Sequence, residues 1–284
     1  MPSRAERLPE SLVDAVLAKL GLSGRPEPTL PGLAALYSAW CRRVPFDNIR
    51  KMAHVRRGDP APLPGDTAAD FFQGWLRHGC GGTCWAGNGA LCDLLDSLGF
   101  RAERVIATMM AAPDLPPNHG STLVRFDDLA YIVDASILHG EPLPLDDVRP
   151  AFDARRAWTV TCSMREGHWI ITWRPLHNPD GLDCRLEEFD AAAAVFRQRH
   201  ERSRSWSPFN DELYLRLNRG DTVIGAAFGQ RVCFEGLGRI AKRPLQGEDR
   251  TRFLIEEIGI AEELVHALPP DSPAPRTQAP AARG

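Results

Sequence analysis

A cysteine that follows a glycine pair is the first candidate for chemistry in this chain. Gly81-Gly82-Thr83 leads into Cys84, and the residues after it predict a helix, because leucines recur at helical spacing up to a glycine stop at Gly99. The first turn of a helix presents free backbone N–H groups and the positive end of the helix dipole, which favour a thiolate over a thiol. Cys84 is therefore a candidate nucleophile.

A thiolate nucleophile needs a base, and the base needs a partner that orients it. His119 stands at the start of a predicted strand, Asp127-Asp128 is a turn signal, and Asp134 ends the predicted returning strand. Such a hairpin places His119 and Asp134 near its open end, where the carboxylate can accept a hydrogen bond from the imidazole. We expect Cys84, His119 and Asp134 to act together.

With these residues in place, the chain resembles the arylamine N-acetyltransferases, which use a Cys-His-Asp triad. Gly81, Gly82, Cys84 and Asn88 match the motif around the family's nucleophile, and Pro45-Phe46-Asp47-Asn48 resembles its Pro-Phe-Glu-Asn motif. His119 and Asp134 match the remaining triad positions, at the expected separation of fifteen residues. Ser207-Pro208-Phe209 resembles a segment near the family's coenzyme A and substrate cleft. The resemblance extends from about Ala18 to Leu268.

The resemblance implies a ping-pong acyltransferase. Cys84 would take an acetyl or other acyl group from acetyl-CoA, a co-substrate and not a tightly bound cofactor. A small arylamine, hydrazine or hydroxylamine would then accept it on nitrogen or oxygen. We expect Phe46, Trp85, Ile137 and Phe209 to contact the substrate. A basic cluster suggests Arg202 and Arg204 as ligands of the coenzyme A phosphates, since arginine favours anions.

Several departures from the family pattern leave the substrate open. Cys80 replaces the arginine of the nucleophile motif, Ala86 replaces an acidic residue, and Ser136-Ile137-Leu138 replaces a Gly-Phe-Gly wall. One alternative is an amide synthase that uses a larger acyl group or one bound to an acyl carrier protein. A thiol hydrolase or peptidase and a non-catalytic binding module are further alternatives. We expect no metal, because the cysteines form no paired zinc knuckle.

The surrounding elements predict an α+β protein in three parts. Helical periodicity dominates residues 1–99, which form a helical domain with the cysteine, and short strands dominate 100–198, an antiparallel β-barrel domain with the histidine and aspartate. Residues 199–268 are expected to form a small α/β lid, and 269–284 a disordered proline-rich tail. The first two domains would form a cysteine-protease-like catalytic core. A loop is expected over 54–66, and strands over 157–162 among others.

Composition limits the function classes. The chain of 284 residues has a net charge of −3, which gives no reason to expect nucleic acid or an anionic membrane surface as a partner. We expect no signal peptide and no membrane span. Seven cysteines without a Cys-x-x-Cys pair indicate reduced thiols and a cytoplasmic protein.

Overall fold

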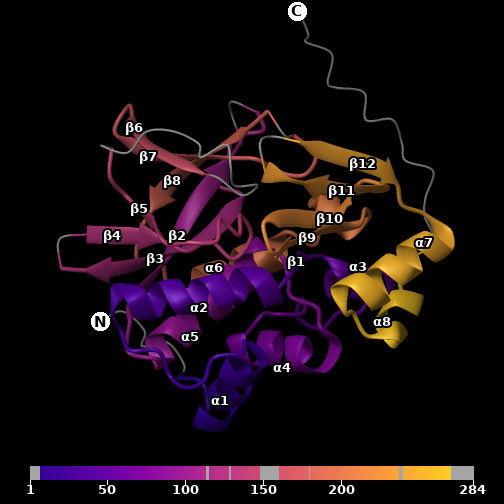
Figure 1. The fold of residues 1–284 in the computed structure, drawn as a ribbon, viewed down its shortest axis with the longest axis horizontal. Helices are drawn as coiled ribbons and strands as arrows, with labels where there is room; N and C mark the ends of the chain where they lie inside the picture. The colour runs from indigo at the N-terminus through magenta and orange to yellow at the C-terminus, as the bar shows by residue number, and fades with distance from the viewer. Residues whose placement is uncertain are drawn as a thin grey trace, which may run out of the picture.

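The computed structural model describes most of the chain, and its elements are arranged as helices beneath two antiparallel sheets (Figure 1). The described residues are 7–112, 115–127, 129–147, 160–178, 180–236 and 239–269.

The N-terminal part is helical. Its helices are α1 (Glu10–Lys19), α2 (Leu30–Arg43), α3 (Ile49–Arg56), α4 (Ala68–His78) and α5 (Cys84–Ser97). Thr29 and Thr67 cap α2 and α4 by accepting hydrogen bonds from the N–H groups three residues further on. The predicted start of the loop over 54–66 is wrong, because helix α3 continues to Arg56. The Ile49 and Met52 side chains of this helix are buried.

The middle part is a seven-stranded antiparallel sheet with the order β5-β4-β3-β2-β8-β7-β6. The strands are β2 (Arg101–Met109), β3 (His119–Phe126), β4 (Leu129–Ile132), β5 (Leu143–Pro144), β6 (Thr161–Arg165), β7 (His168–Trp173) and β8 (Leu182–Glu188). Met164 N–H donates to Asp147 at 2.9 Å, which links β6 to the segment after β5 and leaves the barrel nearly closed. Of the expected strand 157–162, residues 157–159 lie outside the described part of the chain.

The C-terminal part contains a five-stranded sheet with the order β1-β9-β10-β11-β12. Its strands are β1 (Phe46–Asp47), β9 (Tyr214–Arg219), β10 (Thr222–Ala227), β11 (Gln230–Phe234) and β12 (Ile240–Pro244). The helical elements around it are α6 (Ala193–Arg202), η1 (Pro208–Asn210), α7 (Gly247–Arg252), the π-helical turn η3 (Phe253–Ile258) and α8 (Glu262–His266). Strand β1 comes from the N-terminal part, so this sheet joins the two ends of the chain.

The expected α+β class with an antiparallel barrel is confirmed by this arrangement. The predicted domain limits remain predictions, and the limit at 198–199 falls inside α6. The expected tail lies outside the described residues except for Pro269.

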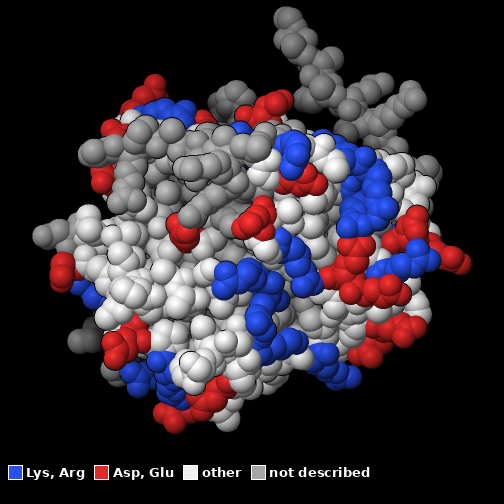
Figure 2. Space-filling model, in the orientation of Figure 1, with Lys and Arg blue, Asp and Glu red and all other residues white. Residues whose placement is uncertain are grey.

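The surface carries charges of both signs. On the face that Figure 2 shows, basic side chains gather near the centre and toward the right edge, with acidic side chains between and around them. Within the described residues, no helix combines the length and the apolar character that a membrane span requires.

Candidate active site

The glycine turn before Cys84 is held against strand β1. Asp47 Oδ2 accepts a hydrogen bond from Gly81 N–H at 2.6 Å, and Asp47 N–H donates to Gly82 O at 3.2 Å. Phe46 and Gly82 also form a parallel bridge. Burial raises the pKa of Asp47 to about 6, although the N–H groups of Gly81 and Ile49 oppose the rise. The turn therefore delivers Cys84 to the start of α5 in a fixed position.

Strands β3 and β4 bring the histidine and the aspartate to this cysteine. Leu123 pairs with Ile132 in the β3–β4 ladder, so the start of β3 and the chain just after β4 lie side by side. His119 Nε2 lies 2.8 Å from Asp134 Oδ2, and Cys84 lies close enough to the His119 ring to raise its pKa. The structure thus brings together the three residues that the sequence proposes as a unit.

The electrostatics of this group favour a charged imidazole. Burial alone would lower the pKa of His119, but the Asp134 carboxylate and the hydrogen bonds to Asp134 and Cys84 outweigh it and raise the pKa to about 10. Burial acts against the Asp134 carboxylate too, yet the His119 charge and hydrogen bond keep the pKa of Asp134 below its usual range. The exposed fractions are 8% for Cys84, 2% for His119 and 0% for Asp134. The imidazole is therefore a strong base in a site with little water.

The second carboxylate oxygen of Asp134 is also fixed. Oδ1 accepts hydrogen bonds from Ser136 N–H at 2.7 Å and from Ile137 N–H at 3.0 Å. The Tyr37 hydroxyl accepts from Asp134 N–H at 3.1 Å and donates to Asp134 O at 2.8 Å. Nothing local in the sequence shows that the Tyr37 hydroxyl reaches residue 134.

His139 supports the same loop and was not singled out from the sequence. Its Nε2 accepts from Asp134 N–H at 3.3 Å, and its Nδ1–H donates to Glu141 O at 2.7 Å. This pair of contacts requires the neutral ring. Burial accordingly lowers the pKa of His139 to about 4.

Asn88 joins the nucleophile helix to the β3–β4 loop. Its Nδ2 donates to Gly120 O at 2.7 Å, and its Oδ1 accepts from Ala135 N–H at 2.9 Å. It is completely buried. The motif match at Asn88 thus corresponds to a positioning contact between the cysteine helix and the segments that carry His119 and Asp134.

The expected substrate residues have different surroundings. Phe46 and Phe209 lie edge to face at 5.6 Å between ring centroids, and both contact the Tyr214 ring. Trp85 packs edge to face on Phe196 at 5.1 Å. These three expected residues lie in aromatic clusters near the nucleophile turn.

Ile137 and the two arginines lie elsewhere than expected. The Ile137 side chain is completely buried in the apolar core of the seven-stranded sheet, so it is a core residue and not a pocket wall. Arg204 donates to Asp59 O at 2.9 Å and Ala61 O at 2.6 Å, besides its ion pair with Glu201. These contacts hold its guanidinium to the loop after α3. Arg202 is exposed at the end of α6.

The structure explains the cysteine that stands where the family motif has an arginine. Cys80 is completely buried in an apolar cluster that includes Leu215 and Phe253, and burial raises the pKa of its thiol. It therefore fills space as a small apolar residue.

Among the described residues, no group of three or more His, Cys, Asp or Glu side chains is placed to hold a metal ion.

Comparison with known proteins finds sequence similarity in the part of the chain that carries this site. A family model described as N-acetyltransferase matches residues 29–154, which include Cys84, His119 and Asp134. An arylamine N-acetyltransferase from Mycolicibacterium smegmatis is 33% identical over 125 residues, which cover 42% of this chain and 43% of the relative. The matching segment thus spans less than half of that relative's length.

Solved structures match over a larger share of the chain. The Mycobacterium marinum arylamine N-acetyltransferase in complex with CoA superposes with a TM-score of 0.75 at 18% identity, over 90% of this chain and 97% of that one. The Nocardia farcinica arylamine N-acetyltransferase gives 0.73 at 22% identity, over 90% and 92%. These two likenesses show the fold.

Proposed function

We propose, from the premise that this chain is a member of the arylamine N-acetyltransferase family, that it transfers an acetyl group from acetyl-CoA to the nitrogen of an arylamine. Hydrazines and hydroxylamines are the related acceptors. The observation that carries the proposal is the 2.8 Å contact between His119 and Asp134, together with the influence of Cys84 on the pKa of the same ring. The comparisons lend no support to an acyl carrier protein as donor.

The first half of the reaction loads the cysteine. The Cys84 proton resides on His119, whose raised pKa favours the charged ring, and the sulfur attacks the thioester carbonyl carbon, forming a tetrahedral oxyanion. The N–H of Cys84, at the start of α5, is the candidate donor to that oxyanion, and one such donor contributes ~3 kcal/mol in other acyl-transfer enzymes. The bond from carbon to the coenzyme A sulfur then breaks, and His119 returns the proton to the departing thiolate.

The second half transfers the acetyl group. The acceptor nitrogen attacks the acetyl-cysteine carbonyl, its proton passes to His119, and the carbon–sulfur bond to Cys84 breaks. Asp134 keeps the imidazole oriented through both halves and stabilises its charged form, as the raised pKa of His119 indicates. The ring cluster of Phe46, Phe209 and Tyr214 supports an aromatic acceptor, since aromatic rings pack edge to face on one another.

Intact-mass measurement tests this proposal. After incubation with acetyl-CoA, the wild-type chain is expected to gain one acetyl group, and Cys84→Ala none. Cys92→Ala is the matched control, because Cys92 is a buried cysteine of the same helix. Acetylation that persists in Cys84→Ala, or disappears in Cys92→Ala alone, would contradict the assignment of the nucleophile.

A matrix of donors and acceptors then separates the alternatives. Acetyl-CoA and longer acyl-CoA thioesters are combined with an arylamine, with a hydrazine or with no acceptor. Acetylated arylamine is the expected product. Free acid formed at the same rate without an acceptor would indicate a hydrolase, and loading only from longer thioesters would indicate an amide synthase. A cytoplasmic location remains a prediction.

A further inference from the structure

The proposed catalytic aspartate stands where the chain leaves the seven-stranded sheet. Val133 N–H still donates to Thr122 O of β3 at 2.9 Å, but Asp134 follows outside the strand. Asp134 is completely buried. Buried backbone N–H and C=O groups are almost always paired, so those of Asp134 need partners other than a neighbouring strand.

The Tyr37 hydroxyl bonds to both of these backbone groups. It donates to Asp134 O at 2.8 Å and accepts from Asp134 N–H at 3.1 Å. It also accepts from the N–H of His139, in the same loop, at 3.2 Å. A phenol has one donor and two acceptor sites, so all three are used. Burial raises the pKa of Tyr37 well above its ordinary value, and the hydroxyl therefore keeps the proton that it donates.

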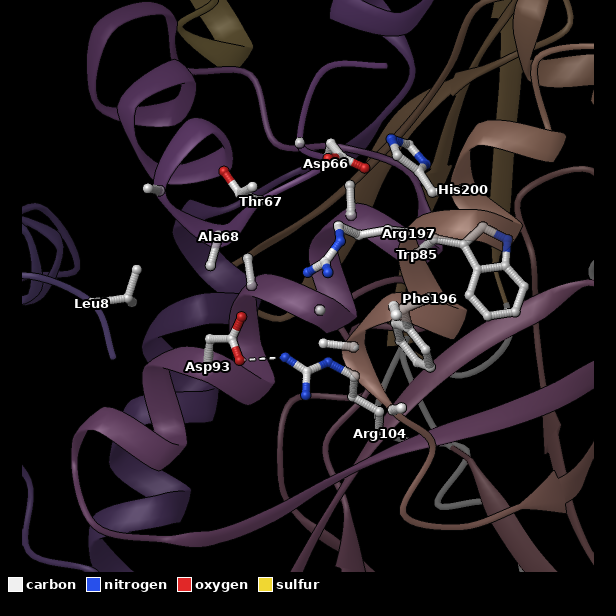
Figure 3. A pocket seen from close by; sticks show the side chains of 18 of the residues that line it. Leu8, Asp66, Thr67, Ala68, Trp85, Asp93, Arg104, Phe196, Arg197 and His200 are labelled. Atoms are coloured by element: carbon white, nitrogen blue, oxygen red, sulfur yellow. Dashed lines mark hydrogen bonds and ion pairs between the residues drawn. The ribbon is translucent and has the colours of Figure 1, made fainter. Parts of the chain in front are cut away.

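The helix that carries the nucleophile has anchors of its own. Asp93 of α5 forms a largely buried ion pair with Arg104 of β2, and Figure 3 shows this pair, with a dashed line, at the wall of a cavity beside α5. Asn88 of α5 donates to Gly120 O of β3 at 2.7 Å. These contacts fix α5 against the sheet, but they include neither backbone group of Asp134. The aspartate segment therefore depends on other contacts for its position.

Tyr37 belongs to a segment that also reaches the nucleophile turn. In Figure 1, α2 runs beneath β3 and β4 toward β1. Ten residues after Tyr37, Asp47 of β1 accepts from Gly81 N–H at 2.6 Å, three residues before Cys84. Tyr37 itself is completely buried, so its ring is held by close packing. One short segment thus contacts both the loop that begins at Asp134 and the turn that delivers the cysteine.

We infer that Tyr37 is a positioning residue of the proposed acetyltransferase, an inference that rests on that proposed function. Its hydroxyl holds the Asp134 backbone so that the carboxylate stays 2.8 Å from His119. This alignment stabilises the charged imidazole, and the charged imidazole keeps the proton off the Cys84 sulfur. Tyr37 acts through Asp134 and not on the reacting atoms.

The variant Tyr37→Phe removes the hydroxyl and keeps the ring. It is expected to fold, because Asp134 O keeps the Leu138 N–H at 3.1 Å and Asp134 N–H keeps His139 Nε2 at 3.3 Å. Alkylation of Cys84 by iodoacetamide, read by peptide mass over a series of pH values, reports the thiolate. We expect the rate at pH 7 to fall ~tenfold, the order of effect of one or two lost hydrogen bonds, and the pH profile to move toward alkaline pH.

A control and a double variant separate positioning from a general loss of packing. Tyr131→Phe makes the same chemical change on β4, where the Tyr131 ring packs against Phe126, and it should keep the wild-type rate and pH profile. Tyr37→Phe is then combined with Asp134→Asn. Because Tyr37 acts through the carboxylate, its loss should change the alkylation rate of the Asp134→Asn chain by less than about twofold.

Urea unfolding establishes that each variant is folded under the assay conditions. A folded Tyr37→Phe with the wild-type rate and pH profile would overturn the inference, and so would the same proportional loss in the Asp134→Asn chain. If Tyr37→Phe did not fold, Tyr37→Met would replace it with the same expected loss, and unfolding of both would reduce Tyr37 to a core residue and overturn the inference as well. Alkylation needs no acetyl-CoA, so a failure of this inference is distinguishable from a failure of acetyl transfer itself.

Discussion

Acid should destabilise this protein through His139, the buried histidine beside Asp134. Its Nε2 accepts a backbone N–H and its Nδ1–H donates to a carbonyl, so protonation at Nε2 would set two donors against each other. His139→Gln replaces the ring with a side chain that does not titrate and whose oxygen can still accept. The variant should lose part of the pH dependence of the unfolding free energy.

The size of the effect follows from the pKa in the two states. The pKa of His139 is about 4 in the fold and near 6.5, its ordinary value, in the unfolded chain. Between these values the unfolded chain binds more protons, so the unfolding free energy falls as the pH falls. The contribution is fully present above pH 6.5. It drops by ~2 kcal/mol from pH 7 to pH 5, and by ~3 kcal/mol below pH 4.

Urea unfolding followed by circular dichroism at pH 7 and pH 5 measures this difference. The wild-type change minus the His139→Gln change isolates the histidine, because other groups titrate equally in both proteins. We expect the wild type to lose ~2 kcal/mol more than the variant over this interval. An equal loss in both would refute the reasoning that His139 is held neutral.

Three further predictions concern the contacts around the nucleophile turn. Asp47 should change the unfolding free energy with pH in the opposite direction to His139, because its pKa of about 6 lies above the ordinary 3.8. The native state therefore gains ~3 kcal/mol of stability as the pH falls from above 6 to below 4. Asp47→Asn should remove this gain in the same urea titrations. Asn48→Ala removes three hydrogen bonds and should lower the unfolding free energy by ~3 kcal/mol at pH 7, and a loss below ~1 kcal/mol would contradict this account. Gly120→Ala places a methyl group 2.6 Å from the Trp85 ring and should cost ~1–3 kcal/mol in chemical denaturation, whereas the control Gly24→Ala, with no atom within 4 Å, should cost much less.

Much of the site followed from local sequence signals. A hairpin pattern was enough to place His119 beside Asp134, because the β3–β4 register sets them side by side. That Cys84 joins them was predicted from the needs of a thiolate nucleophile and from the family resemblance. Asp47 could be placed near the turn through the motif it belongs to. These signals are local, and tertiary packing did not override them.

The parts of the site that the sequence did not predict depend on contacts between segments far apart in the chain. Tyr37 and His139 bond to the backbone of Asp134, and no period in the sequence shows this. Ile137 looked like a pocket wall because it follows the aspartate, yet its side chain turns into the sheet core. Charged and polar residues alternate with the buried Cys184 and Leu186 of strand β8, which weakens the apolar signal for a strand there.

The two-residue strand β1 has a consequence for how substrates reach the sulfur. Its neighbour Asn48 donates to the carbonyls of Phe209 and Glu212 and accepts from Tyr214 N–H, while Asp47 bonds to the turn before Cys84. If the C-terminal sheet moved away as a rigid body, the hydrogen bonds of Asn48 would break, and the turn that positions Cys84 would lose its support. We therefore expect substrates to enter without displacement of the C-terminal sheet, and a fragment that ends before residue 214 would lack the contacts that help to align its own cysteine.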